Sequence, residues 1–349
     1  MKILIFTSGA LGDILILLPI LQGIRQQYPH AHITLLNKHI SVSAQAPLEL
    51  TRKAGCVDRI IALPKYKFNL WKLFSFIPYP GRKQYDQVFY LQREGRSLPG
   101  KLKKDIPFFQ RISKYPVRGA SSLENWRTPG GVYPRMYELV LKRINANSSV
   151  PIIPGTGTLT FSQSDQQHAQ EILASLNIPA GMTPFICCIG GKQQVSHYPL
   201  KKYRALIQKI VTETAAVPVF IGGIHDEKNI RALCAELPSG KCFYANQLTI
   251  DLWTSICFMS CCAFYLGNDT GSMHMAAAAG LRCIVPESSH DPAGLWLPIG
   301  EGHQIFRSQP EPDCVGCRKQ TCPKGSPAPC IDSINENDLF NAVMAMLKE

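Results

Sequence analysis

Several signatures that would place this chain in a common functional class are missing from its 349 residues. No window offers eighteen uncharged apolar residues, which argues against a membrane-spanning helix. No helix-turn-helix, zinc-finger or RNA-recognition motif favours nucleic acid as a partner. No Walker phosphate loop occurs, so nucleotide hydrolysis is disfavoured as the main reaction. No Gly-x-Gly-x-x-Gly follows the first predicted strand, which disfavours a dinucleotide-dependent oxidoreductase.

A cleavable signal peptide is also missing, although Lys2 precedes an apolar run. Asp13 lies within that run, Gly9 and Gly12 suggest a turn, and no convincing small-residue cleavage site follows. We therefore expect a cytoplasmic protein. Its charge leaves room for a peripheral position on the inner face of the cytoplasmic membrane.

Charge is distributed unevenly along the chain. Residues 1–150 contain 23 Lys and Arg against 8 Asp and Glu, a formal charge of +15, whereas residues 151–349 contain 14 against 17, or −3. This asymmetry suggests an acidic, extended partner such as an anionic lipid surface or a phosphorylated saccharide. Residues 65–96 and 105–127 combine basic and aromatic side chains, which suits an anionic lipid interface. The alternative is aromatic core residues beside a solvated charged face. The aromatic residues in the first of these segments include Trp71, Phe74, Phe76, Tyr79 and Phe89.

Length and pattern predict two α/β domains. One core usually stops growing at about 250–300 residues. Strand-like and helix-like runs alternate in both halves, as in parallel sheets with crossover helices. We expect domains at residues 1–155 and 156–334, joined by a Pro/Gly-containing linker, and a closing amphipathic helix at 335–349. The predicted strands are residues 2–6, 32–36, 59–62, 87–91, 184–189, 217–221, 263–266 and 282–285.

The most informative stretch is Leu266-Gly-Asn-Asp-Thr-Gly-Ser-Met-His274. It joins a predicted strand to a predicted helix at 273–279, closed by Gly280. The first amides of such a helix lack internal partners and lie at the positive end of its dipole, so they bind phosphate well. Asp269 can accept from ribose or sugar hydroxyls, and the Thr270 hydroxyl can donate. The alternative is a capped helix after a strand, which is common in any α/β protein.

A second informative stretch, Thr7-Ser-Gly-Ala-Leu-Gly-Asp13, follows the first predicted strand. Together the two stretches resemble glycosyltransferase family 9, whose best-known members are the lipopolysaccharide heptosyltransferases. The family's Leu-Gly-Asp is matched by Leu11-Gly-Asp13. Its Gly-Asn-Asp-Thr-Gly-Pro-Met-His is matched by residues 267–274, with Ser272 in place of the proline.

Downstream elements extend this resemblance over nearly the whole chain. Asp291-Pro292 and Pro298-Ile-Gly300 echo the family's Asp-Pro and Pro-Tyr-Gly. The chain departs from the family at Phe6, where members often have a basic residue. It also departs at Pro286-Glu-Ser-Ser-His290, which replaces the more usual Phe-Gly-Pro-Thr.

The resemblance implies an α/β protein of the GT-B fold, in which two Rossmann-like domains with parallel sheets face a central cleft. It implies an inverting glycosyltransferase that moves a heptose from an ADP-activated donor to the anionic inner core of lipopolysaccharide. The N-terminal domain would bind the acceptor and the C-terminal domain the nucleotide sugar. No cofactor is required for this chemistry.

The resemblance also implies roles for individual residues. Asp13 would be the catalytic base, although it could instead cap the helix that follows it. Lys192, after Gly190-Gly191, resembles a family lysine that contacts the donor phosphates, although a lone Lys in a loop is usually solvated surface. The expected donor-binding residues are Asp269, Thr270, Gly271, Ser272, His274 and, for the ribose, Glu227.

The 13 cysteines are consistent with a reducing compartment, and buried free thiols are the default interpretation for Cys187, Cys188, Cys257 and Cys261. Cys314-x2-Cys317-x4-Cys322-x7-Cys330 lies in a Pro/Gly-rich loop that core packing does not explain. Four thiolates could bind a structural zinc or iron ion. The alternative is a set of free or weakly paired thiols.

Two rival functions remain open at the level of sequence. A GT-B transferase could use another nucleotide sugar and a polysaccharide or protein acceptor. A protein of the same fold could bind a nucleotide or carbohydrate without transferring it.

Overall fold

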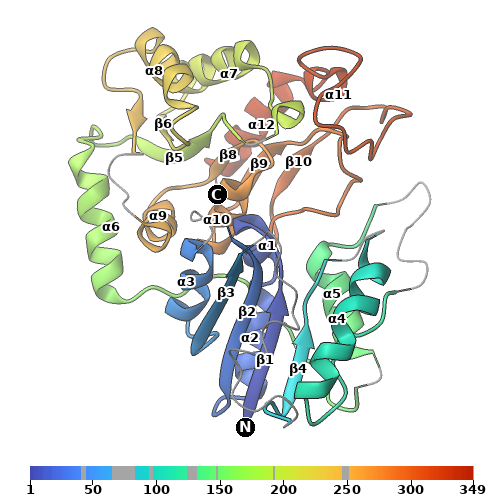
Figure 1. Ribbon diagram of the computed structural model, residues 1–349. Helices are drawn as coiled ribbons and strands as arrows, with labels where there is room; N and C mark the ends of the chain where they lie inside the picture. The colour runs from blue at the N-terminus through green and yellow to red at the C-terminus, as the bar shows by residue number, and fades with distance from the viewer. Residues whose placement is uncertain are drawn as a thin grey trace. The chain divides into compact units, whose positions relative to one another are not determined.

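The computed structural model describes residues 1–40, 45–64, 83–93, 97–123, 132–146, 148–191, 193–245 and 251–348. The chain divides into two compact units, Met1–Gly157 and Thr158–Glu349. Each unit is built on a parallel sheet flanked by helices (Figure 1). The expected α/β class with two parallel sheets is therefore confirmed.

The sheet of the first unit has the strand order β3-β2-β1-β4. Its strands are β1 (Lys2–Thr7), β2 (His32–Ile40), β3 (Arg59–Pro64) and β4 (Gln87–Tyr90). The central strand β1 is buried from Ile3 to Thr7, as expected of a continuous apolar run in a parallel sheet. The helices are α1 (Leu11–Ile16), α2 (Leu18–Gln27), α3 (Gln45–Lys53), α4 (Leu98–Ile112) and α5 (Met136–Asn145).

Pro19 decides where the second helix of this unit begins. A proline inside a helix removes a hydrogen bond and clashes with the preceding turn, but it is tolerated in the first turn. The sequence therefore predicts either a kink or a helix that begins near Leu18. The second outcome is found, since α1 ends at Ile16 and α2 begins at Leu18.

The sheet of the second unit has the strand order β10-β9-β8-β5-β6-β7, and all its paired strands are parallel. The strands are β5 (Thr183–Cys188), β6 (Ala216–Phe220), β7 (Phe243–Tyr244), β8 (Tyr265–Gly267), β9 (Cys283–Pro286) and β10 (Gln304–Phe306). The helices are α6 (Gln163–Ser175), α7 (Leu200–Glu213), α8 (Glu227–Glu236), α9 (Leu252–Met259), α10 (Gly271–Ala278), α11 (Pro329–Asp332) and α12 (Glu336–Met346). All eight predicted strands occur. The sequence missed β7 and β10, whose residues are only partly buried, unlike the fully buried β8.

Both sheets contain a point at which the order of strands reverses. In the first unit the chain adds β2 and β3 on one side of β1 and then returns to add β4 on the other. In the second unit the corresponding neighbours are β5 and β8. Open parallel sheets bind ligands at the carboxyl ends of the two strands at this switch point. Each unit therefore presents one preferred location for a ligand.

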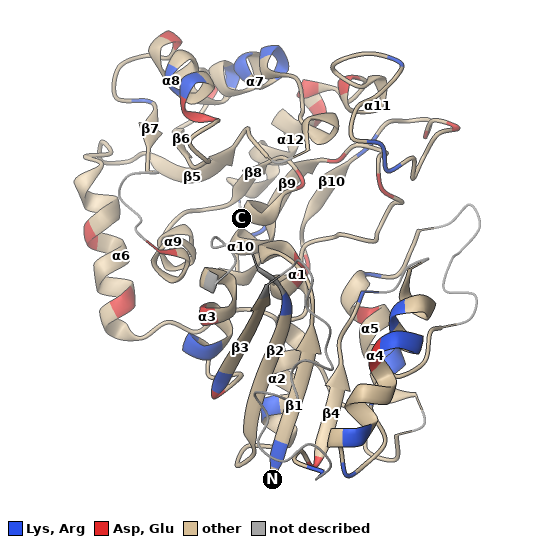
Figure 2. Cartoon of the chain, in the orientation of Figure 1, with Lys and Arg blue, Asp and Glu red and all other residues tan. Residues whose placement is uncertain are grey.

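Basic residues occur along α4 (Figure 2), and Lys103, Lys104 and Arg111 of this helix are exposed. Most of the basic and aromatic segment at 65–96 lies outside the described residues. Within the described part, Phe89 is fully buried in the sheet and belongs to the core. For this residue the alternative interpretation, a core aromatic, is the right one.

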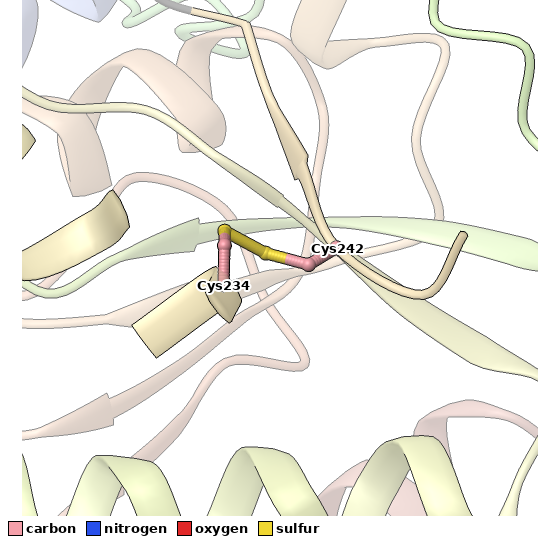
Figure 3. The surroundings of a disulfide bond; sticks show 2 residues. All are labelled: Cys234 and Cys242. Carbon is pink, nitrogen blue, oxygen red and sulfur yellow. A yellow bond between two sulfur atoms is a disulfide. The ribbon is translucent and has the colours of Figure 1, made fainter. Parts of the chain in front are cut away.

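One pair of cysteines is covalently bonded, which the sequence did not predict. Cys234 in α8 and Cys242 just before β7 are joined by a disulfide bond (Figure 3). The two cysteines are eight positions apart in the chain, and the turn between α8 and β7 brings their Cα atoms to 5.4 Å, within the range that a disulfide requires. Cys187, Cys188 and Cys257 are buried and free, as predicted, whereas Cys261 is free but only partly buried.

Candidate active site

The turn after β8 is organised by Asn268, which is fully buried. Its side-chain oxygen accepts hydrogen bonds from the Tyr198 amide and the Tyr203 hydroxyl, both at 3.0 Å. Its side-chain nitrogen donates to the carbonyl oxygens of Ile189 at 2.8 Å and Gly190 at 3.1 Å. Asn268 thereby fastens the turn after β8 to the turn after β5 at the switch point of the sheet.

The glycines after β5 allow three turns to meet at this edge of the sheet. A Cβ atom on Gly190 would lie 2.0 Å from a carboxylate oxygen of Asp226, which follows β6. A Cβ atom on Gly191 would lie 2.6 Å from Thr270, which follows β8. Side chains at positions 190 and 191 would therefore displace both neighbours. Lys192, the next residue, lies outside the described residues, and its assignment stays a prediction.

Helix α10 presents its N-terminus to this convergence of turns. It begins at Gly271, two residues earlier than predicted, so Gly271 and Ser272 belong to its first turn and His274 is its fourth residue. Thr270 is the N-cap residue, but its hydroxyl makes no capping hydrogen bond to the helix. The Met273 amide bonds to the Thr270 carbonyl at 3.1 Å. The amides that precede it belong to the positive end of the helix, which attracts anions.

Glu227, proposed from sequence as a ribose contact, is the first residue of α8 and forms an ion pair with Arg231 at 2.6 Å. Its neighbour Asp226 contacts the glycine turns instead. Asp226 accepts a hydrogen bond from the Gly223 amide at 2.8 Å and lies against Gly190. Sequence reasoning missed Asp226, although the two Gly-Gly pairs were a signal that a side chain must pack closely over them.

His274 lies inside the second unit rather than on its surface, with 6% of its area exposed. Burial, and secondarily the nearby His303, lowers its pKa from 6.5 to about 4. The imidazole is therefore neutral near pH 7. A neutral buried ring can support the first turn of α10 but adds no positive charge to a phosphate site.

Carboxylates gather beyond the ends of β8 and β9. Burial raises the pKa of Asp269 well above its usual range, and the negative charges of Glu287 and Asp291 raise it further, against the opposing effect of Arg307. Arg307 pairs with Glu287 at 2.7 Å, and both side chains are less than 10% exposed. Arg307 also pairs with Glu311.

Arg307 and its partners hold residues 286–291 in place, and this segment includes Pro286-Glu-Ser-Ser-His290, which departs from the family's sequence. Besides its two carboxylate partners, Arg307 donates to the carbonyl oxygen of Asp291 at 3.0 Å. Ser288 and Ser289 are buried, and the Ser289 hydroxyl donates to Glu311 at 2.5 Å. The sequence offered no signal for this network, because its members are divided between the loop after β9 and the loop after β10.

The first unit places Asp13 at its own switch point, after β1. Asp13 is the third residue of α1, and one carboxylate oxygen accepts a hydrogen bond from the Ala10 amide at 2.9 Å. The other oxygen lies 3.0 Å from Nη1 of Arg93, which follows β4. A Cβ atom on Gly9 would lie 2.3 Å from Cβ of Asp13. Asp13 therefore does support the start of a helix, as the alternative interpretation held. Its carboxylate keeps further lone pairs for a substrate hydroxyl.

The four cysteines near the C-terminus are free in the structure, and Cys314 is exposed. The part of the chain that the structure describes includes all four. Within that part, no group of three or more His, Cys, Asp or Glu side chains is arranged to hold a metal ion. A structural metal ion at these cysteines stays a prediction.

No helix among the described residues has both the length and the apolar character needed to cross a membrane.

An open parallel sheet in which glycine-containing turns meet at the switch point is typical of nucleotide-binding α/β proteins. Comparison with known proteins narrows this class. Residues 150–326 match glycosyltransferase family 9 (heptosyltransferase), and the chain belongs to this family. It is therefore a glycosyltransferase.

Individual relatives agree with this assignment. Lipooligosaccharide heptosyltransferase 2 of Haemophilus ducreyi is 27% identical over 297 residues, which cover 80% of each protein. The structure of E. coli ADP-heptose LPS heptosyltransferase II aligns over 100% of this chain and 99% of its own, with 16% identity and a TM-score of 0.68. A family 9 glycosyltransferase from Veillonella parvula aligns over 99% and 97%, with 15% identity and a TM-score of 0.71. The chain thus shares its two-sheet fold with these enzymes.

Proposed function

We propose that this protein transfers a heptose from an ADP-activated donor to the inner core of lipopolysaccharide, with inversion at the anomeric carbon. The observation that carries the proposal is the convergence of the turns after β5, β6 and β8 on the N-terminus of α10. The printed names of two relatives, one a lipooligosaccharide heptosyltransferase and one an ADP-heptose LPS heptosyltransferase, support the choice of sugar, nucleotide and acceptor.

In this proposal the second unit binds the donor. The diphosphate lies at the first amides of α10, with Thr270, Gly271 and Ser272 around it. Lys192 contributes positive charge to the leaving diphosphate. Asp269 faces hydroxyl groups of the donor, which fits a carboxyl group whose pKa is raised, since its protonated form can both donate and accept. Asp226 or Glu227 binds the ribose.

The first unit supplies the base. The acceptor hydroxyl oxygen attacks the anomeric carbon of the donor heptose, and the bond from that carbon to the diphosphate oxygen breaks. ADP leaves with the bonding electrons, and the hydroxyl proton passes to the carboxylate of Asp13. The contact with Arg93 supports this role because it holds one carboxylate oxygen of Asp13 in place beside the turn after β4.

The direct test is transfer by the purified protein from ADP-heptose to lipopolysaccharide that lacks an inner-core heptose. ADP release and a gain of one heptose in acceptor mass should appear together. Asp13→Asn is the matched control, because it keeps size but removes the proton acceptor, and we expect its kcat to fall by about 10²–10⁴. If the protein uses a different nucleotide sugar and does not react with ADP-heptose, the assignment of the donor is refuted. If Asp13→Asn has a near wild-type kcat, the assignment of Asp13 as the base is refuted.

We further propose that the first unit meets its acceptor at an anionic membrane surface, on the basis of the formal charge of +15 in residues 1–150. Binding to anionic vesicles should weaken steeply with salt, since exposed charges are screened beyond about 8 Å at physiological ionic strength. Equal binding to neutral and anionic vesicles at low salt would contradict this.

A further inference from the structure

The turns after β1 and β4 are linked by three successive side-chain contacts. The Thr7 hydroxyl donates to the carbonyl oxygen of Leu91 at 3.3 Å, and the Ser8 hydroxyl donates to the side-chain oxygen of Gln92 at 2.5 Å. The third contact is the ion pair between Asp13 and Arg93 at 3.0 Å. Three consecutive residues after β4 thus each contact a residue between the end of β1 and the first turn of α1, where the proposed base lies.

A buried arginine also fixes the backbone at the end of β4 and in the segment that follows it. Arg143 of α5 is 1% exposed and donates through Nη2 to the carbonyl oxygens of Tyr90, at 3.1 Å, and Gln92. The Tyr90 hydroxyl donates to buried Asp105 of α4 at 2.8 Å. A buried guanidinium must keep its hydrogen bonds, so the backbone that leads into Arg93 has one well-defined position.

Folding stability does not explain why a cation is placed beside Asp13. The Arg93 side chain is 47% exposed, and ion pairs at such sites contribute little to stability. The arrangement even has a cost, because Lys101 is close enough for the charge of Arg93 to lower its pKa, after the larger effect of burial. Asp105 and Asp13 oppose that effect, whereas Lys38 adds to it.

We propose that Arg93 is a positioning residue for Asp13, an inference that rests on the proposed role of Asp13 as the base. The Ala10 amide fixes one carboxylate oxygen and Arg93 fixes the other, while Gly9 leaves the space that the side chain needs. Arg93 thereby sets the orientation in which the carboxylate receives the acceptor hydroxyl. Residues that hold a reacting group within a fraction of an ångström can change rates by about a hundredfold.

The test is a double-mutant cycle with Asp13→Asn, Arg93→Gln and both changes together, measured as kcat with ADP-heptose and acceptor. Arg93→Gln alone should lower kcat by about 10–100-fold with the ADP dissociation constant unchanged. In the Asp13→Asn background the same change should cost less than about twofold, because Arg93 acts only through Asp13. Lys114→Gln is the matched control, since Lys114 pairs with Asp86 at 2.6 Å before the first residue of β4, at the opposite end of the sheet. It should leave kcat unchanged.

The cycle separates failure of this inference from failure of the proposed base. If Asp13→Asn is slow and Arg93→Gln lowers kcat by the same factor in both backgrounds, Asp13 remains the base and the positioning role is refuted. If Asp13→Asn is as fast as the wild type, both assignments fall. If Arg93→Gln lowers kcat only because the protein is less stable, the positioning role is also refuted. In that case Arg93→Lys, which keeps the charge, should restore thermal stability and kcat together.

Discussion

Asn268 and Gly190 are separated by 78 residues in sequence, yet the side-chain nitrogen of Asn268 donates to the Gly190 carbonyl oxygen at 3.1 Å. This contact ties the turn that leads into α10 to the glycine turn that precedes Lys192. The buried side-chain amide of Asn268 therefore holds together the two turns of the proposed donor site, and it can do so without contacting the donor.

Asn268→Ala should weaken donor binding and the fold together. It removes four hydrogen bonds and leaves buried carbonyl oxygens without their donors, at a cost of about 1–3 kcal/mol for each unsatisfied group. Chemical denaturation and calorimetric titration with ADP would measure the two effects. The exposed Asn337→Ala is the control and should change neither. An Asn268→Ala protein with wild-type ADP affinity would show that the turn positions itself without this clamp.

Gly271→Val should weaken ADP binding at least about tenfold while leaving the fold intact. The substitution puts a branched side chain in the first turn of α10, where backbone must approach the diphosphate. Calorimetry gives the affinity and thermal unfolding gives the fold. Gly100→Ala is the control, because a Cβ atom there meets no atom within 4 Å. Unchanged affinity in Gly271→Val would place the diphosphate elsewhere.

His274 should make the protein less stable at mildly acidic pH. Its pKa is about 4 in the folded protein against an ordinary value of 6.5, so below pH 6.5 the unfolded chain takes up a proton that the folded protein does not. The contribution of His274 to the free energy of unfolding is therefore fully retained above pH 6.5. It is lost as the pH falls from 6.5 to 4, and the loss reaches about 3 kcal/mol.

Urea unfolding of wild type and His274→Leu between pH 4 and 8 measures this contribution. The variant should lose that part of the pH dependence, whereas exposed His225→Gln should keep it. Identical slopes for wild type and His274→Leu would indicate that the imidazole is protonated in the folded protein.

Reduction of the disulfide between Cys234 and Cys242 should lower stability by about 2–3 kcal/mol, as expected for a short closed loop. Thermal unfolding with and without dithiothreitol measures the difference. The double variant Cys234→Ser/Cys242→Ser should unfold at the temperature of the reduced wild type and should not respond to the reductant. A reductant effect that persists in the double variant would assign the stabilisation to other cysteines.

Local signals predicted the elements of this fold well. Buried parallel strands tend to be apolar runs, so eight of the ten strands among the described residues were visible in the sequence, and Pro19 indicated the start of α2. The start of α10 was placed two residues late, because Gly271 and Ser272 have low helix propensity and the capping position was read too far along the chain. The disulfide was missed because spacing alone does not show which thiols approach one another.

The proposed site residues divide in the same way. Glycine turns after apolar runs indicate Gly190, Gly191, Thr270 and Asp13 from the sequence alone. Asp226, Arg307 and Arg93 were not predicted as site residues. Each becomes conspicuous only through its partner on another loop, at Gly190, Glu287 and Asp13 respectively.

The sequence by itself thus determined which segments form strands and helices and which turns can approach a phosphate. Only the tertiary structure decided which turns meet, through the strand orders β3-β2-β1-β4 and β10-β9-β8-β5-β6-β7. Periodicity reflects contacts between neighbours in sequence, whereas strand order depends on hydrogen bonds and packing between segments that are far apart in the chain. The pairings of Asn268 with Gly190 and of Asp13 with Arg93 follow from that order and have no local signature.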